Sequence, residues 1–320
     1  MLFTEAFSKV LINAARENKN IVAVTAAMQN GTGLSAFSQI FSNRFFDVGI
    51  AEEHAVTFAA GLSAKGLKPV VAIYSTFIQR SVDQIIHDCA LQKLPIILAL
   101  DRSGFVDADG ETHQGLFDIA LFRSTPNTAI LTPASENEIK LMFDWALEQS
   151  LTVIIRYPKA YCPIEADAFS LPVETGKGVW ISKSSANVCL FFTGSLYTEI
   201  LEASVLLKEN GINADIYNLR FIKPVDEDYF TGIINDYELS VFIEEGILHG
   251  GFGEYALSLI QRRGCKTEAL VLAVESGFLE EDRALGTRQE LLRENNLDGK
   301  GISKSIISKL NSVMKERNKV

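Results

Sequence analysis

Cysteine is scarce in this sequence, and its spacing suggests neither a metal cluster nor a disulfide framework. Cys89, Cys162, Cys189 and Cys265 lie far apart, and none belongs to a Cys-x-x-Cys pair. Zinc sites and small secreted scaffolds use closely spaced or paired cysteines. We therefore expect reduced, mostly buried thiols, and we assign no metal ligand to this chain.

Long apolar runs and an excess of positive charge are also missing. No hydrophobic run approaches the roughly 20 residues of a membrane-spanning helix, and the N-terminus lacks a basic segment before an apolar core. The formal net charge of −10 disfavours nucleic acid as a partner, because binding a polyanion requires clustered Lys and Arg. These features predict a cytoplasmic protein that binds neither membrane nor nucleic acid.

The sequence is rich in short apolar runs that alternate with helical segments. In the first half these runs cover residues 21–26, 46–51, 68–75, 96–101 and 153–155. Strands that alternate with helices of this length are typical of a mostly parallel sheet covered on both faces. We therefore predict an α/β fold. Between two of the runs, Val82, Ile85, Ile86 and Cys89 are expected to share one helical face.

The same alternation predicts two domains. The first covers residues 1–165 and the second residues 186–320, and residues 166–185 lose the alternation and are assigned to a linker. Near the C-terminus, apolar residues at helical spacing predict an amphipathic helix that closes the second domain. Adjacent Glu244 and Glu245 should point to opposite sides of a strand, so they are not expected to form a metal pair.

Polar residues follow several of the predicted strands. Glu52 and Glu53 follow the run at 46–51, and further polar clusters follow the later strands. The carboxyl ends of parallel strands meet at one edge of a sheet, where such folds bind ligands. The two acids would equally suit the first turn of a helix, where the macrodipole favours negative charge. The residues alone leave both interpretations open.

Several segments resemble a known family. "DVGIAEEHAVTFAAGL", "KPVVAIYSTFIQRSVDQIIHD", "LQKLPIILALDRSGFVDADGETHQGLFDIA" and "IIRYPK" resemble the pyrimidine-binding domain of 1-deoxy-D-xylulose-5-phosphate synthases. These are thiamine-diphosphate enzymes of the transketolase family. "NLRFIKPVD" and "VFIEEGILHGGFGEY" resemble that family's C-terminal domain. The resemblance covers essentially the whole chain and implies two α/β domains, each with a mostly parallel sheet.

The resemblance also implies an activity and a missing part. The synthases decarboxylate pyruvate and add its two-carbon unit to glyceraldehyde 3-phosphate. Their N-terminal domain holds the cofactor diphosphate through Mg²⁺, using a GDG motif that this sequence lacks. We therefore expect a C-terminal half that needs an N-terminal diphosphate-binding domain or subunit and is inactive alone. A homodimer or a heterotetramer is the expected assembly.

The family's functional residues can be placed on this sequence one by one. Glu52 matches the catalytic glutamate that meets the aminopyrimidine ring, Phe77 matches the aromatic that stacks on this ring, and Ile50 matches a further cofactor contact. His113 matches a residue expected to assist proton transfer. The expected substrate contacts are Tyr74, Arg80, Arg102, Asp109 and Arg156.

Arg80 and Arg156 are expected to hold the substrate phosphate, because the planar guanidinium favours bidentate contacts. Each role has a plainer alternative: Phe77 would pack in a core, His113 would lie on the surface, and Arg156 would form a structural ion pair. Asp107 stands where the family usually has Gly. Its negative charge beside a phosphate-binding site leaves the identity of the substrate open.

Two other functions remain open from the sequence. A split transketolase would use a ketose donor in place of pyruvate. A non-catalytic binding or scaffold protein would keep the fold without the chemistry. Against this last function, the family's residue types are retained at Glu52, Arg80, Asp109, His113 and Arg156.

Overall fold

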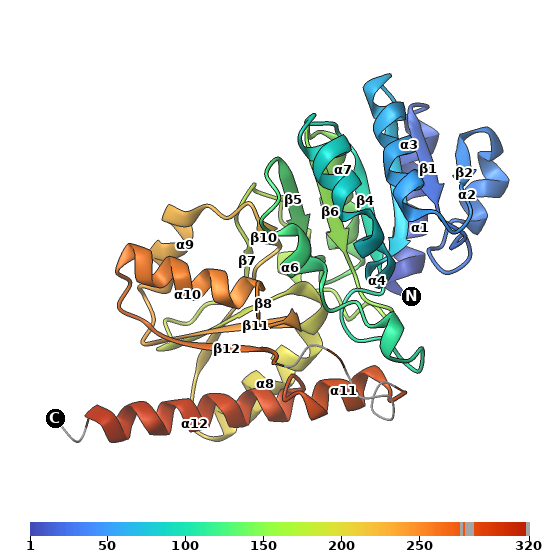
Figure 1. The fold of residues 1–320 in the computed structure, drawn as a ribbon. Helices are drawn as coiled ribbons and strands as arrows, with labels where there is room; N and C mark the ends of the chain where they lie inside the picture. The colour runs from blue at the N-terminus through green and yellow to red at the C-terminus, as the bar shows by residue number, and fades with distance from the viewer. Residues whose placement is uncertain (276–277, 279–284, 318–320) are drawn as a thin grey trace.

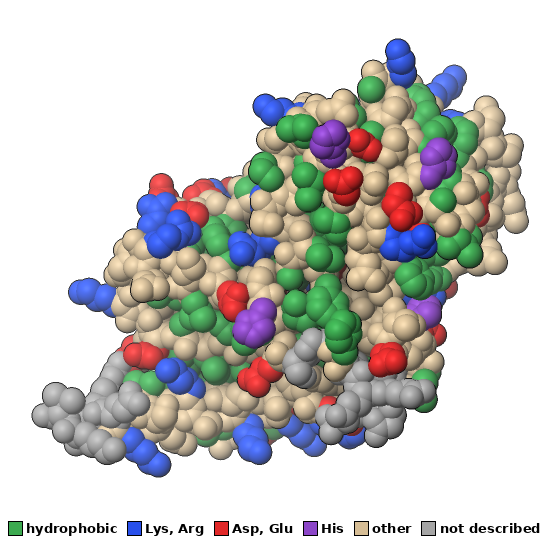
Figure 2. All heavy atoms as spheres, in the orientation of Figure 1, with side chains coloured by type: hydrophobic (Ala, Val, Ile, Leu, Met, Phe, Trp, Pro, Cys, Tyr) green, Lys and Arg blue, Asp and Glu red, His purple; other side chains and the backbone are tan. Residues whose placement is uncertain are grey.

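The computed structural model describes residues 1–275, 278 and 285–317, which form two α/β units in contact with each other (Figure 1). Each unit contains a mostly parallel sheet flanked by helices, as the alternation of apolar and helical segments predicts. On the face shown in Figure 2, Lys and Arg side chains are scattered among acidic ones. Among the described helices, none is long and apolar enough to cross a bilayer.

The first sheet has the strand order β10-β5-β6-β4-β3-β1-β2 in the described part of the chain. Its strands are β1 (Ile21–Thr25), β2 (Phe45–Asp47), β3 (Lys68–Tyr74), β4 (Ile97–Asp101), β5 (Thr128–Leu131), β6 (Thr152–Arg156) and β10 (Phe221–Lys223). The strands from β5 to β2 are all parallel. Every residue of β1, β4 and β6 is buried, because helices cover both faces.

The helices of the first unit are α1 (Phe3–Glu17), α2 (Ser35–Ile40), α3 (Glu52–Ala64), α4 (Ser75–Ile78), α5 (Val82–Gln84), α6 (Asp118–Phe122) and α7 (Glu136–Leu147). After α5 the chain continues as a π-helix over Ile85–Ala90. This wider turn breaks the helical face that the spacing predicts. Ile85 and Cys89 are buried, but Ile86 is 44% exposed.

The second sheet has the order β12-β11-β8-β9-β7 in the same described part. Its strands are β7 (Val179–Ser182), β8 (Val188–Phe192), β9 (Ala214–Asn218), β11 (Leu239–Ile247) and β12 (Glu268–Val274). The helices are α8 (Tyr197–Glu209), α9 (Glu227–Ile234), α10 (Phe252–Arg263), α11 (Arg288–Glu294) and α12 (Gly299–Arg317). In Figure 1, α12 runs along the bottom of this unit beside α8.

Two short strands depart from the expected division of the chain. β7 lies within residues 166–185, the expected linker, and pairs antiparallel with β9. β10 follows β9 in the chain but pairs antiparallel with β5 of the first sheet. Both strands are only three or four residues long, and so they give little periodicity in the sequence.

Candidate active site

Glu52 is the first residue of α3, at the carboxyl edge of the first sheet. Its side chain is buried, with 2% exposed, and Arg80 Nη1 lies 2.7 Å from Oε2. Arg80 compensates the Glu52 charge, and its own side chain is 44% exposed. Ionised side chains are seldom this buried unless they are paired, and a carboxylate in such a position is a candidate functional group.

A row of aromatic rings lies near Arg80, the ion-pair partner of this acid. Tyr74, at the end of β3, stacks on Phe77 of α4 with 5.9 Å between ring centroids. Phe77 in turn meets the His113 ring edge-on at 5.3 Å. Phe77 is only half-buried, and with Arg80 it lines a cavity of about 580 Å³. A partly exposed ring in a cavity shared with the arginine that pairs with Glu52 suits a planar, hydrogen-bonding heterocycle.

Arg102 continues the row on the other side of Tyr74. Its guanidinium carbon lies 3.5 Å from the Tyr74 ring centroid, a cation–π contact. Burial raises the pKa of the Tyr74 phenol, while Arg102 opposes that rise. Gly31 permits this packing, because a β-carbon there would overlap the Tyr74 hydroxyl. Arg102 has φ of +61°, an uncommon backbone conformation that clusters at functional sites.

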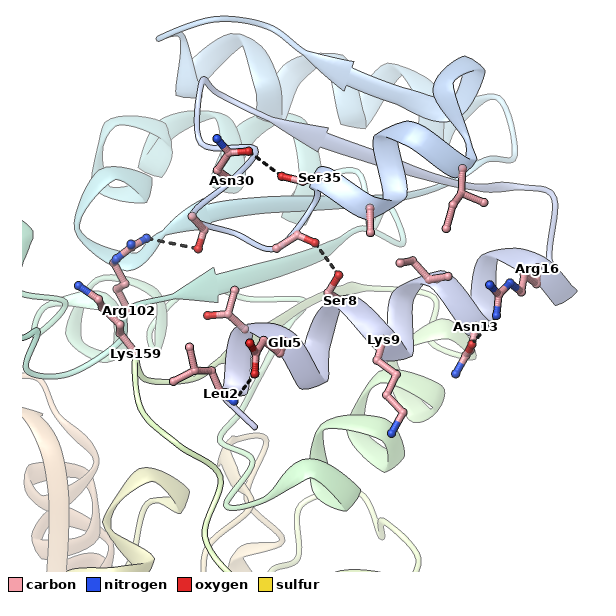
Figure 3. Close-up of a pocket in the computed structure, with 16 residues that line it drawn as sticks. Leu2, Glu5, Ser8, Lys9, Asn13, Arg16, Asn30, Ser35, Arg102 and Lys159 are labelled. Carbon is pink, nitrogen blue, oxygen red and sulfur yellow. Dashed lines mark hydrogen bonds between the residues drawn. The ribbon is translucent and has the colours of Figure 1, made fainter.

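Asp109 lies between two cations. Its Oδ2 is 3.0 Å from Lys159 Nζ and 3.7 Å from Arg102 Nε, and that Nε is buried without a hydrogen-bond acceptor. Figure 3 shows Arg102 and Lys159 side by side at one end of a cavity of about 720 Å³. Both cations also act on the buried carboxyl group of Asp101, whose pKa is raised by burial. Two adjacent cations at a cavity suit an anionic ligand group.

Lys159 is the functional candidate that sequence reasoning missed. It follows β6 in "RYPK", a polar cluster from which Arg156 alone was selected. The signal available was its position after a strand end, the same signal that selects Arg102 after β4. The Lys159 partner is not visible in the sequence, because Asp109 comes from a different loop than Lys159.

Arg156 and Ile50 differ from the other expected site residues in their burial and contacts. Arg156 Nε pairs with Asp118 Oδ2 at 2.8 Å, and Nη2 donates to the Glu245 carbonyl at 3.1 Å. With 3% of Arg156 exposed, these contacts favour the structural ion pair over the expected phosphate contact. Ile50 lies two residues before Glu52 and is 77% exposed.

Asp107 also has partners that the sequence does not indicate. Its Oδ1 accepts a hydrogen bond from the backbone N–H of Arg288, the first residue of α11. It lines a separate cavity between the two units, to which Arg288 also contributes. The Asp107 carboxylate, which was expected beside the phosphate site, therefore accepts a hydrogen bond from the second unit.

Asp101, the last residue of β4, lies beneath Arg102. Thr4 Oγ1 donates to its Oδ2 at 2.7 Å, while Oδ1 has no donor. Burial raises the pKa of Asp101 to about 7, against the opposing effects of the Thr4 hydrogen bond and the Arg102 charge. The contact ties the start of α1 to the strand that carries Arg102.

The fold and the site together define a ligand-binding α/β protein. Its site offers an acid and a ring face for a heterocycle, and a cation pair for an anionic group, along the carboxyl edge of a parallel sheet.

The chain belongs to the transketolase family. Residues 1–163 match the family model "Transketolase, pyrimidine binding domain", and residues 176–302 match "Transketolase, C-terminal domain". This confirms the expected family, whose members use thiamine diphosphate.

Curated relatives are named 1-deoxy-D-xylulose-5-phosphate synthase. The chain is 55% identical to that of Treponema pallidum (strain Nichols) over 279 residues, or 87% of this chain and 44% of the relative. It is 42% identical to that of Clostridium acetobutylicum over 307 residues, or 96% of this chain and 49% of the relative. The chain thus spans about half the length of these relatives and corresponds to their C-terminal half.

Solved structures show the same fold. A split-gene transketolase, described as an inactive β4 tetramer, superposes with a TM-score of 0.84 and 25% identity. The superposition covers 96% of this chain and 97% of that one. The transketolase of Campylobacter jejuni, at 16% identity and a TM-score of 0.77, shares the fold over 96% of this chain and 46% of its own.

Proposed function

We propose that this chain is the pyrimidine-binding and C-terminal half of a thiamine-diphosphate-dependent 1-deoxy-D-xylulose-5-phosphate synthase. The reaction condenses pyruvate, with loss of CO₂, with glyceraldehyde 3-phosphate. The 55% identity to the Treponema pallidum relative supports this reaction. The observation that carries it is Glu52, a buried carboxylate at the start of α3 whose ion-pair partner Arg80 lines the same cavity as Phe77.

Thiamine diphosphate supplies the electron sink that the two-carbon transfer requires. Glu52 holds a proton at the ring nitrogen of the aminopyrimidine, where its burial strengthens the hydrogen bond. Phe77 supports the ring by stacking, and Ile50 adds apolar surface at the same strand-to-helix junction. Arg80 balances the Glu52 charge through the 2.7 Å ion pair.

The substrate groups are assigned to the other end of the row. Arg102 and Lys159 bind the phosphate of glyceraldehyde 3-phosphate, in place of the Arg80 and Arg156 pair expected from the sequence. Tyr74 orients Arg102 through the cation–π contact. Asp109 accepts hydrogen bonds from substrate hydroxyls, and His113, against Phe77, moves protons at the substrate oxygens.

The cofactor diphosphate and Mg²⁺ are assigned to an N-terminal half in a separate subunit or in the same longer chain. The half-length match to the relatives supports this, as does the likeness to a split-gene transketolase. We propose a homodimer or heterotetramer once both halves are present, and an inactive protein without the N-terminal half.

Reconstitution tests the proposed function. The chain would be mixed with the N-terminal half of the Treponema pallidum relative, thiamine diphosphate and Mg²⁺. We expect 1-deoxy-D-xylulose 5-phosphate from pyruvate and glyceraldehyde 3-phosphate, and none from either half alone. Turnover with xylulose 5-phosphate but not pyruvate would identify a split transketolase, which the neighbour of 25% identity favours as the second candidate. Binding without turnover of either donor would favour the non-catalytic function.

Replacing Phe77 with Ala should weaken thiamine-diphosphate binding by about 5-fold, because a stacked ring pair is worth roughly 1 kcal/mol beyond its buried area. Calorimetric titration of the reconstituted enzyme would measure this change. Phe58→Ala is the matched control, since that half-buried ring packs on Phe46 and His54 of the same unit. Equal affinity in wild type and Phe77→Ala, with lower stability in the variant, would leave Phe77 a packing role only.

A further inference from the structure

The loop between β4 and α6 carries three of the proposed site residues, Arg102, Asp109 and His113. A pair of backbone hydrogen bonds between Gly104 and Gly115, each 2.8 Å long, closes the loop at its base. Between these glycines the loop extends past the edge of the first sheet. The first unit contacts the loop at Asp109, through Lys159, and at Thr112, through Thr76. The base and the middle of the loop are also contacted from the second unit.

Glu245 of β11, in the second unit, contacts the base of the loop. The carboxylate is fully buried, and its Oε1 accepts a hydrogen bond from the Phe105 N–H at 2.9 Å. Gly104 has φ of +89°, and a β-carbon there would collide with the Glu245 carboxyl group. Glu244, the neighbouring acid, faces the other side and accepts hydrogen bonds from the first N–H groups of α10. The prediction that the two acids point in opposite directions is thus confirmed.

Arg288 joins Glu245 to the middle of the loop. Its Nε and Nη2 donate to the two Glu245 oxygens at 2.9 and 2.6 Å, a bidentate pair. The Arg288 backbone N–H donates to Asp107, and the Ala108 N–H donates to the Gly286 carbonyl at 3.2 Å. The start of α11 thus contacts the loop at two consecutive residues, immediately before Asp109.

We propose that Asp107, Glu245 and Arg288 form an interdomain latch that positions the loop for substrate binding. The three residues touch no reacting atom and act through the neighbouring Asp109 and its partner Arg102. The expected effect of the latch on substrate affinity rests on the proposed function. Its expected effect on the position of the loop does not depend on that function. It gives the C-terminal domain a role in the site: setting the affinity for the phosphorylated acceptor.

Asp107 is the latch residue that can be removed with least harm to the fold. It lies in a loop and is half-buried, whereas Glu245 and Arg288 form a buried ion pair. Without Asp107, Arg288 keeps both bonds to Glu245 and still faces Glu199 at 3.9 Å. Asp107→Ala therefore removes the loop contact alone, and Asp107→Asn restores it, because the amide oxygen still accepts a hydrogen bond.

The test compares Asp107→Ala and Asp107→Asn with Glu294→Ala, which removes an exposed acid from α11. In the full chain, Asp107→Ala should speed amide hydrogen exchange of residues 103–115 by about 10-fold, as expected when one buried hydrogen bond is lost. In the reconstituted enzyme its KM for glyceraldehyde 3-phosphate should rise by about 10-fold with kcat near wild type, because positioning is lost without loss of chemistry. Asp107→Asn should recover most of both effects.

Unchanged loop exchange in Asp107→Ala, or an equal change in Glu294→Ala, would overturn the latch. Faster loop exchange with an unchanged KM would overturn its role in substrate affinity. An inactive wild-type assembly would count against the proposed function and not against the latch, because exchange is measured on the chain itself.

Discussion

Reconstituted enzyme that carries Glu52→Gln is expected to turn over about 100- to 10,000-fold more slowly than wild type, the range of general acid–base contributions. The amide has nearly the same shape as the carboxylate, so the fold should be kept. It cannot carry the shared proton, and its NH₂ group would face a ring nitrogen that should itself donate. The loss should therefore appear in kcat, and cofactor binding should fall less.

Steady-state kinetics on the reconstituted enzyme, with thermal unfolding to verify the fold, would measure the effect. Glu53→Gln is the matched control. Glu53 is adjacent and acidic, but its side chain is 43% exposed and lies 3.7 Å from Arg80. It should retain turnover close to wild type. A Glu52→Gln enzyme as active as this control would remove the assignment of Glu52 and, with it, the main support for thiamine chemistry.

Replacing Arg220 with Met is expected to lower the free energy of unfolding by about 3 to 5 kcal/mol, the usual cost of breaking a buried ion pair from one side. Arg220 Nε donates to Glu138 Oε1 at 2.6 Å, and neither side chain is more than 2% exposed. The other guanidinium nitrogens donate to backbone carbonyls of Ala168, Leu171 and Pro172. The variant would leave the Glu138 carboxylate buried without its cation. Burial already raises the pKa of Glu138, and the Arg220 charge opposes that rise.

Urea unfolding of the full chain, followed by fluorescence and circular dichroism together, would measure this loss and show whether the two units unfold as one. Arg293→Met provides the matched control, because Arg293 is exposed on α11. Its effect should stay within about 0.5 kcal/mol, as for most surface changes. Similar stabilities for the two variants would show that the Arg220 network adds no net stability.

The fold could be predicted because alternating apolar and helical segments have one common solution, a parallel sheet between helices. The grouping of Tyr74, Arg102 and Asp109 follows from the same geometry, since the ends of neighbouring parallel strands share an edge. The partners in the ion pairs could not be predicted. Arg156 meets Asp118 and the Glu245 backbone across two distant segments, and such pairings depend on tertiary packing.

The same limit applies to the cation pair and to the interdomain contacts. Lys159 gains its importance from Asp109, 50 residues earlier in the chain. Asp107 suggested a charge in the site when it was considered alone, but its carboxylate accepts a hydrogen bond from the start of α11 in the second unit. Family resemblance transfers residue types and positions. Contacts with residues of another domain are known only from the three-dimensional structure.

The strand β10 bears on how a gene for this protein can be divided. In sequence the units are separated by a linker, but in space the first sheet ends with a strand from the second half of the chain. A cut after residue 165 would remove β10 and Arg220 together. It would leave the buried residues of β5 (Thr128–Leu131) as an open sheet edge, which tends to recruit strands from other molecules. Gene fission or domain shuffling at that linker would therefore yield aggregating pieces, so the two domains should be inherited as one unit.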